Sequence, residues 1–168
     1  MQVFSGKAVF GGIAIGKISV YAKDQTQVKR VKIDDPEAEI ARYHSAKDVA
    51  IEQLGVLYEK ALKEVGEDGA GVFEAHQMML EDGDYIDSVE NIIRTEEVNA
   101  EYAVAQTGDQ FAQMFLDMED EYFRGRAADM HDISERLINV LLGRGAGGIE
   151  TDEQVIITQK QIDEDMQD

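Results

Sequence analysis

The densest grouping of chemically useful side chains lies in Val72 to Tyr85, which reads VFEAHQMMLEDGDY and combines large apolar residues with four acids. If this stretch is helical, one line along it holds Val72, Ala75, Met79 and Asp82, and His76, Met78 and Tyr85 flank that line. The adjacent methionines can make the soft, adaptable contacts found at protein-binding surfaces. The same spacing also fits methionines that fill a core, so the pattern predicts either docking or core packing.

A second grouping lies in Glu119 to Asp132, which reads EDEYFRGRAADMHD. Arg126 follows Tyr122 by four residues and precedes Asp129 by three, so a helix would place all three side chains on one face. Such a row can anchor an incoming group, or it can form an internal ion pair between Arg126 and Asp129. Spacing alone leaves both interpretations open.

The histidines do not fit the di-metal centre that some helical bundles hold. That centre needs a Glu three residues before a His on each of two helices. Counting back three residues from a histidine of this chain reaches only alanine or phenylalanine; the histidines are His44, His76 and His131. The acidic segment Asp117 to Glu121 could hold a hard cation weakly, but a solvated helix end explains it better. We therefore predict neither a metal nor a cofactor for this chain.

No nucleophile with an activating base stands out in the sequence. No serine lies in a GxSxG turn, and the chain has no cysteine. The glycines of GGIAIG, residues 11–16, lack the Lys-Ser or Lys-Thr of a phosphate-binding loop. His76 and Glu74 stand only two residues apart on a predicted helix, so their side chains would diverge. The residues therefore indicate no catalytic site within this chain.

Composition and charge narrow the classes of partner. The chain has 168 residues, and 35 acids against 16 basic residues give a formal net charge of −19. Such a field repels nucleic acid and anionic lipid and favours a basic partner, although it is also a common route to solubility. We find no signal peptide and no apolar run of membrane-spanning length. We expect a protein of the cytoplasm that binds neither nucleic acid nor membrane.

Long amphipathic helices must position these groupings. Asp35 followed by Pro36 predicts a strong helix start, Gly66 predicts its end, and a single proline leaves later helices uninterrupted. Asn99 can cap a later helix, and Gly143 can end the last one. The predicted helices run from 36 to 65, from 69 to 82, from the acidic break at 82–84 to about 94, from 99 to 118 and from 122 to 142. We expect a mainly α fold in which these helices form an antiparallel bundle.

The two ends of the chain differ from this helical part. The first 22 residues hold many glycines and β-branched residues and no acid, which predicts strands at Ile13 to Ile15 and Ile18 to Tyr21. A similar run, Gln154 to Thr158, follows a glycine-rich segment. The terminal strands could meet in one small sheet, so the helical part would be an insertion between them.

Three segments together resemble enzyme I of the bacterial phosphoenolpyruvate:sugar phosphotransferase system: GGIAIGK at 11–17, FEAHQMMLED at 73–82 and DEYFRGRAADMHDISERL at 120–137. The middle one fills that family's F-E-x-H-x-x-x-L-x-D pattern. The order and spacing also match, and the resemblance covers about residues 3 to 157. It implies that residues 34–143 form a claw-like domain of helical hairpins that binds the phosphocarrier HPr. Residues 1–33 and 144–168 would then form part of an α/β phosphohistidine domain, the swivelling domain of that family.

The resemblance also assigns roles to residues of this chain. It implies that the carboxylates of Glu67, Asp82 and Asp84 receive basic groups of HPr and that Arg126 belongs to the same surface. The apolar contacts of this surface with HPr would be Val72, Met78, Met79, Tyr85, Phe115 and Tyr122. Phe73, His76 and Leu80 would instead point inward. The segment Val72 to Tyr85 would then divide into a structural half and a binding half.

The family's chemistry points outside this chain. In the family, phosphoryl passes from phosphoenolpyruvate to an enzyme histidine and then to a histidine of HPr during sugar uptake. That enzyme histidine lies in a Gly-Gly-x-Ser/Thr-Ser-His motif, which the sequence lacks. The Mg²⁺-dependent phosphoenolpyruvate site and most of the homodimer interface belong to a C-terminal domain. We therefore expect a truncated enzyme I that recognises HPr and transfers no phosphoryl group alone, with a diverged tail after Thr158.

A different class of function stays open from the sequence. A helical adaptor or regulatory module could keep the bundle and bind another basic protein. Recovery of such a protein without HPr would favour this alternative.

Overall fold

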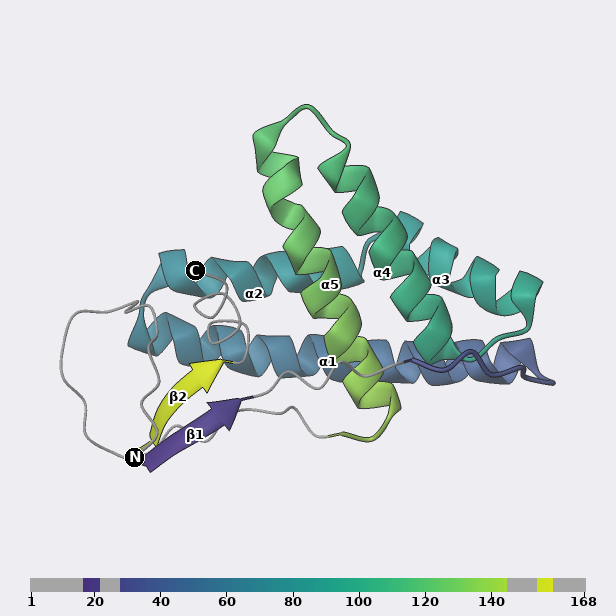
Figure 1. The fold of residues 1–168 in the computed structure, drawn as a ribbon, viewed down its shortest axis with the longest axis horizontal. Coiled ribbons are helices and arrows are strands. Elements are labelled where there is room, and N and C mark those ends of the chain that lie inside the picture. Colours follow the sequence, from purple (N-terminus) through teal and green to yellow (C-terminus); the bar gives the residue numbers. More distant parts are fainter. Residues whose placement is uncertain (1–16, 22–27, 145–153, 159–168) are drawn as a thin grey trace, which may run out of the picture. The chain divides into compact units, whose positions relative to one another are not determined.

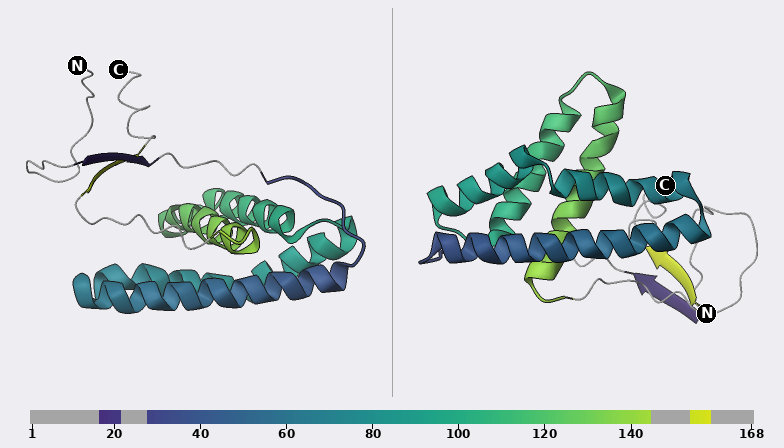
Figure 2. Two further views of the ribbon diagram at one scale, coloured as in Figure 1. Left: turned by 90° about the horizontal axis from the view of Figure 1, so that it is seen from below. Right: turned by 180° about the vertical axis from the view of Figure 1, so that it is seen from behind.

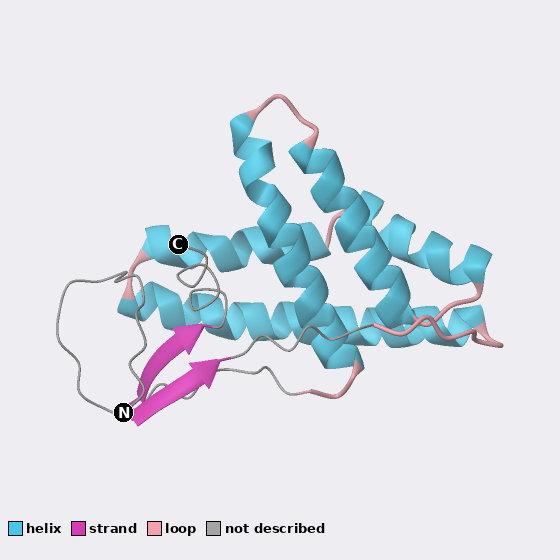
Figure 3. Ribbon diagram, in the orientation of Figure 1, coloured by secondary structure: helices cyan, strands magenta, loops and turns pink. Residues whose placement is uncertain are grey.

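The computed structural model describes residues 17–21, 28–144 and 154–158, which divide between two compact units. The larger unit, Val28–Gly147, is helical. Its described residues form five helices (Figures 1 and 3): α1 Pro36–Glu64, α2 Glu67–Leu80, α3 Gly83–Glu96, α4 Ala100–Leu116 and α5 Glu121–Leu141. The prediction of a mainly α fold is therefore confirmed. No helix in the described part of the chain is long and apolar enough to cross a membrane.

The helix ends follow the capping signals of the sequence. The Asp35 side chain accepts a hydrogen bond from the Ala38 backbone N–H, and Pro36 occupies the first turn of α1. Gly66, with φ of +83°, joins α1 to α2, and Gly143, with φ of +66°, follows α5. Glycine adopts this left-handed backbone at little cost. The five predicted helices are thus confirmed, with ends within about two residues of those expected.

The helices lie in two layers (Figure 2). α1 and α2 form a long antiparallel hairpin, and α4 and α5 form a second hairpin packed across it, with α3 linking the two. α4 and α5 approach closely at Gly108, where an added Cβ would lie 2.3 Å from the Ser134 Oγ. The core draws on every helix, and its largest fully buried side chains include Tyr43, Leu54, Leu80, Tyr85, Ile93, Val104, Met130, Ile133 and Leu137.

The segment before α1 belongs to the helical unit. The Ile33 N–H donates to the Glu97 carbonyl, and the Asn99 N–H donates to the Val31 carbonyl, as in a short antiparallel pair. The helical unit therefore starts at Val28, before the boundary at residue 34 that the sequence predicted. The backbone pairing explains the difference, because Val31 and Ile33 have hydrogen-bond partners in this unit.

The second unit contains two described strands. β1, Lys17–Tyr21, pairs in parallel with β2, Gln154–Thr158, in a register that sets Ile18 opposite Val155 and Val20 opposite Ile157. The strands predicted within residues 17–21 and 154–158 are thus observed, and they share one sheet. The strand predicted at Ile13 to Ile15 lies outside the described residues.

Candidate functional site

Helix α2 separates into a buried and an exposed face, as the sequence predicted. His76 and Leu80 are buried, and Phe73 packs against the core. On the other face Val72 is exposed and Met78 leaves 67% of its surface accessible. An exposed, unbranched methionine is the kind of side chain that can make adaptable apolar contacts.

The junction between α2 and α3 concentrates negative charge. Glu81, Asp82 and Asp84 are all exposed there, and Glu67 is exposed in the first turn of α2. Asp82 is also the N-cap of α3, because one of its oxygens accepts hydrogen bonds from the N–H groups of Asp84 at 3.0 Å and Tyr85 at 3.1 Å. The cap fixes the Asp82 carboxylate in place at the end of α2. The predicted acidic positions therefore all lie at the surface.

Tyr85 does not lie at the surface, so the prediction that it contacts a partner is wrong. The side chain is fully buried, and its hydroxyl lies 3.0 Å from the Ser134 Oγ of α5. Burial raises the pKa of Tyr85 to about 12, against the opposing effect of the Ser134 hydrogen bond. The reason is the helix break: α2 ends at Leu80, and Tyr85 follows the axis of α3, where it shares an inward face with Val89 and Ile93.

Aromatic side chains gather at the junction of α4 and α5. Tyr122 is 63% exposed, and its ring meets that of Phe123 edge to face at 5.5 Å between centroids. The Phe123 ring lies 6.2 Å from that of Phe115, which is half-buried against the core, as is Met79. Phe115 and Met79 therefore offer only part of their surfaces to a partner. Phe123 was not among the residues predicted from the sequence. A signal was available, because Phe123 is a large apolar residue in the first turn of α5, before Ala127, the first buried residue of that helix.

Helices α2 and α5 meet through a row of polar side chains. Asp129 accepts from the Arg126 Nη1 at 3.1 Å through one oxygen, and its other oxygen lies 3.2 Å from the His76 Nε2. The Arg126 Nη2 donates to the Tyr122 hydroxyl at 3.0 Å, with the guanidinium 5.2 Å from the centre of the ring. Hydrogen bonds to Tyr122 and Asp129 raise the pKa of Arg126. The row of three predicted on α5 is present, and His76 extends it to α2.

The remaining histidines and the acidic segment make local contacts. The His44 Nε2 lies 2.8 Å from Glu90, and the His131 Nδ1 lies 3.6 Å from Asp109. Asp120 caps α5 by accepting from the Tyr122 N–H at 2.8 Å, as expected of a helix end. Within residues 17–21, 28–144 and 154–158 there is no group of three or more His, Asp or Glu side chains that could hold a metal ion.

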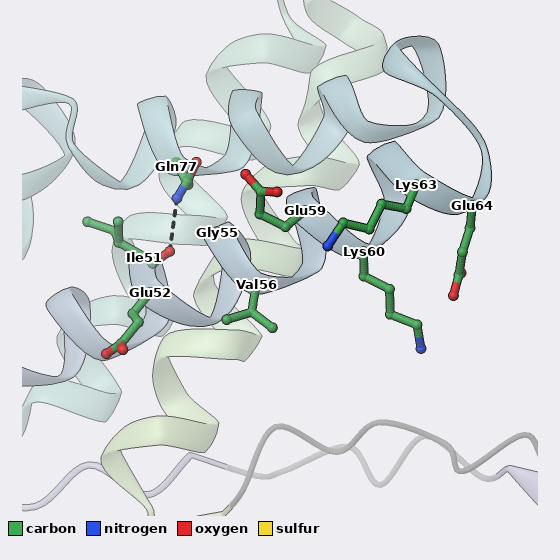
Figure 4. Close-up of a pocket in the computed structure, with 9 residues that line it drawn as sticks. All are labelled: Ile51, Glu52, Gly55, Val56, Glu59, Lys60, Lys63, Glu64 and Gln77. Atoms are coloured by element: carbon green, nitrogen blue, oxygen red, sulfur yellow. Dashed lines mark hydrogen bonds between the residues drawn. The ribbon is translucent and has the colours of Figure 1, made fainter.

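An open groove runs along the hairpin of α1 and α2 (Figure 4). Its volume is about 670 Å³, and the Gln77 amide donates to the Ile51 carbonyl across it at 3.0 Å. The groove is lined by Ile51, Glu52, Gly55, Val56, Glu59, Lys60, Lys63, Glu64 and Gln77. It contains none of the predicted site residues.

The predicted residues that reach the surface come from three helices. Apolar Val72 and Met78, a group of carboxylates and the Tyr122 and Arg126 pair lie on α2, the start of α3 and the start of α5. Figure 1 shows α5 crossing α2, and the bond between His76 and Asp129 joins the two helices. Exposed apolar side chains with polar and charged groups around them are typical of surfaces that recognise proteins.

The chain is similar to known proteins of one family. A family described as "PEP-utilising enzyme, N-terminal" matches residues 5–126. Phosphoenolpyruvate-protein phosphotransferases of Listeria monocytogenes and Bacillus subtilis are each 38% identical, over 82% and 85% of this chain. The chain spans about a quarter of the length of these relatives, 24% and 25%.

Two solved structures are also similar. The solution structure of an enzyme I protein has a TM-score of 0.79 and 38% identity, and the match covers 93% of this chain and 64% of that one. The N-terminal domain of a nitrogen enzyme 1 has a TM-score of 0.68 at 20% identity over 82% of this chain and 58% of that one, which bears on the fold alone.

Proposed function

The chain belongs to the family of PEP-utilising enzymes, in its N-terminal part, and we propose that it binds the phosphocarrier HPr. The observation that carries this proposal is the exposed face of α2, which includes Val72 and Met78 and is followed by exposed carboxylates at the start of α3. This face would bind HPr so that phosphoryl can pass from an enzyme histidine to the HPr histidine in sugar uptake.

The burial of individual side chains changes the set of residues that we propose to contact HPr. It contains Glu67, Val72, Met78, Asp82, Asp84, Tyr122 and Arg126, with partial contributions from Met79, Phe115 and Phe123. Tyr85 leaves the set because it is fully buried. Apolar side chains at the centre of such a surface supply most of the affinity, and the carboxylates raise the rate of encounter with a basic protein.

The chemical step would need parts beyond those described here. We propose that the histidine that carries phosphoryl, the Mg²⁺-dependent phosphoenolpyruvate site and the dimer interface belong to a longer cytoplasmic enzyme. The sequence has no Gly-Gly-x-Ser/Thr-Ser-His motif, so this chain alone would bind HPr without transferring phosphoryl. Strands β1 and β2 would be the edge of the phosphohistidine domain, into which the helical unit is inserted.

The test compares two exposed apolar residues of the α1–α2 hairpin. Met78→Ala should weaken binding of Bacillus subtilis HPr by about five- to tenfold, because it removes an anchor from the proposed surface. Val56→Ala is the control, since Val56 is 66% exposed and lies on α1 in a groove whose lining contains none of the proposed contact residues. Isothermal titration calorimetry measures both affinities. Equal, small effects of the two variants would contradict the proposed surface.

A further inference from the structure

The row of polar side chains between α2 and α5 runs from the interior to the surface. The His76 and Asp129 side chains expose only 11% and 18% of their surfaces, Arg126 exposes 31%, and Tyr122 is largely exposed. The carboxylate of Asp129 therefore joins a buried ring to a cation at the surface. A carboxylate that is mostly shielded from water is destabilised when it loses a hydrogen-bond partner. The charged Asp129 side chain therefore depends on both His76 and Arg126.

The row fixes the direction of the Arg126 side chain. Its guanidinium is held at one end by the Asp129 carboxylate and at the other by the Tyr122 hydroxyl, and it also lies against the Tyr122 ring. An exposed arginine without such contacts samples many rotamers, and ordering it on binding has an entropic cost. Among the described residues these bonds use two of the five N–H groups, so the guanidinium keeps donors that a partner can reach.

We propose that His76 and Asp129 are positioning residues that hold Arg126 ready to donate to an acceptor on the partner. The proposal rests on the proposed function, because the partner is HPr bound at the face of α2 and α5. His76 fixes the Asp129 carboxylate, and the carboxylate fixes Arg126. Neither His76 nor Asp129 needs to touch HPr.

The arrangement also selects the chemistry of the partner. Arg126 is a cation on a chain of net charge −19, and its row reaches α2, the helix that ends at the exposed acids Asp82 and Asp84, through the contact between Asp129 and His76. A purely basic surface would be repelled at this point. The matching surface therefore has basic groups facing Asp82 and Asp84 and, beside them, a hydrogen-bond acceptor facing Arg126. Such a mixed pattern fixes the register of a complex and disfavours other basic proteins.

The first experiment is a double-mutant cycle on HPr affinity. Asp129→Asn alone should weaken HPr binding by about fivefold, the size usual for coupled neighbours, and should have little effect when Arg126 is already alanine. His76→Phe should give a smaller loss that also disappears in the Arg126→Ala background. If each substitution lowers the affinity for HPr equally with Arg126 and with alanine at position 126, the positioning proposal is overturned. The proposal that the chain binds HPr is not affected by that result. Thermal unfolding of each variant shows whether it folds. If either Asp129→Asn or His76→Phe does not fold, the cycle is measured with the other one.

The second experiment does not need HPr. In the free chain, the Arg126 side-chain Nε–H should show a high heteronuclear NOE that falls in Asp129→Asn. Arg124, exposed on the same helix, is the internal reference and should be mobile in both proteins. If Arg126 is as mobile as Arg124 in the wild type, His76 and Asp129 do not position it, whatever HPr does. If Arg126 is rigid in the wild type but the wild-type chain does not bind HPr, the result would instead count against the proposed function.

Discussion

At the scale of single residues, the site depends on side chains that combine two tasks. Asp82 caps α3 through hydrogen bonds to two backbone N–H groups and leaves its charge at the surface. Asp129 holds Arg126 on its own helix and His76 on the facing helix. The structural roles of these residues therefore overlap with their proposed roles in recognition, so a substitution at these positions is informative only when it separates the two.

Asp82 allows that separation. Asp82→Asn keeps a side-chain acceptor and a good N-cap, so the free energy of unfolding should change by less than about 0.5 kcal/mol, whereas Asp82→Ala should lose about 1 kcal/mol. Both variants remove the charge and should slow association with HPr equally. Stopped-flow association rates and urea unfolding measure the two effects. If Asp82→Asn associates with HPr at the wild-type rate, the charge of Asp82 plays no part in the encounter of the two proteins.

At the scale of elements, the helices could be predicted because their signals are local. Asp35, Pro36 and Gly66 act through their own backbone, so the sequence was sufficient to bound α1. Tyr85 was misplaced because its direction depends on a new helix axis after Asp82, which periodicity along α2 does not carry. The bond between His76 and Asp129 was missed because the partners are 53 residues apart and meet only through helix packing.

The contact between α4 and α5 depends on Gly108. A Cβ at this position would lie 2.3 Å from the Ser134 Oγ and 2.9 Å from its Cβ, so Gly108→Ala should force the helices apart and destabilise the fold by about 1–3 kcal/mol. Gly125 in α5 meets nothing within 4 Å, so Gly125→Ala should stabilise the fold by about 0.5–1 kcal/mol. Chemical denaturation measures both. Similar effects of the two substitutions would contradict the close packing.

Three helix ends meet around Arg42. Its guanidinium donates to Glu39, to Glu101 of α4 and to the Leu141 carbonyl of α5, and Glu39 also accepts from the Ala100 N–H. Burial acts to raise the pKa of Glu101, but hydrogen bonds from Arg42, its own backbone and Asn99 outweigh it, so the pKa falls below 4.5. The charged form is therefore the one that the folded state favours.

This cluster predicts a pH dependence of stability. Because the folded pKa of Glu101 is lowered, its contribution is present above pH 4.5 and is lost as the pH falls through the folded pKa. Glu101→Gln should destabilise the fold by about 1 kcal/mol at neutral pH, and the gap from wild type should close in acid. Unfolding curves from pH 7 to pH 3 measure the gap. A gap independent of pH would show that the Glu101 charge does not contribute.

At the scale of the whole molecule, the described residues divide between a helical unit and a second unit that contains β1 and β2. The helical unit, Val28–Gly147, contains every residue of the proposed surface. The strongly acidic chain should attract HPr at long range, and salt should weaken that attraction. Recognition by this chain should therefore be separable from phosphoryl transfer.

The most direct measurement is a titration of ¹⁵N-labelled Bacillus subtilis HPr with this chain, followed by NMR. We predict chemical-shift changes on one basic face of HPr around its histidine, smaller at high salt, and no phosphoryl transfer when phosphoenolpyruvate and Mg²⁺ are added. Circular dichroism of the same sample shows that the helices are folded. A folded chain that leaves the HPr spectrum unchanged at the highest concentration reached would contradict the central claim.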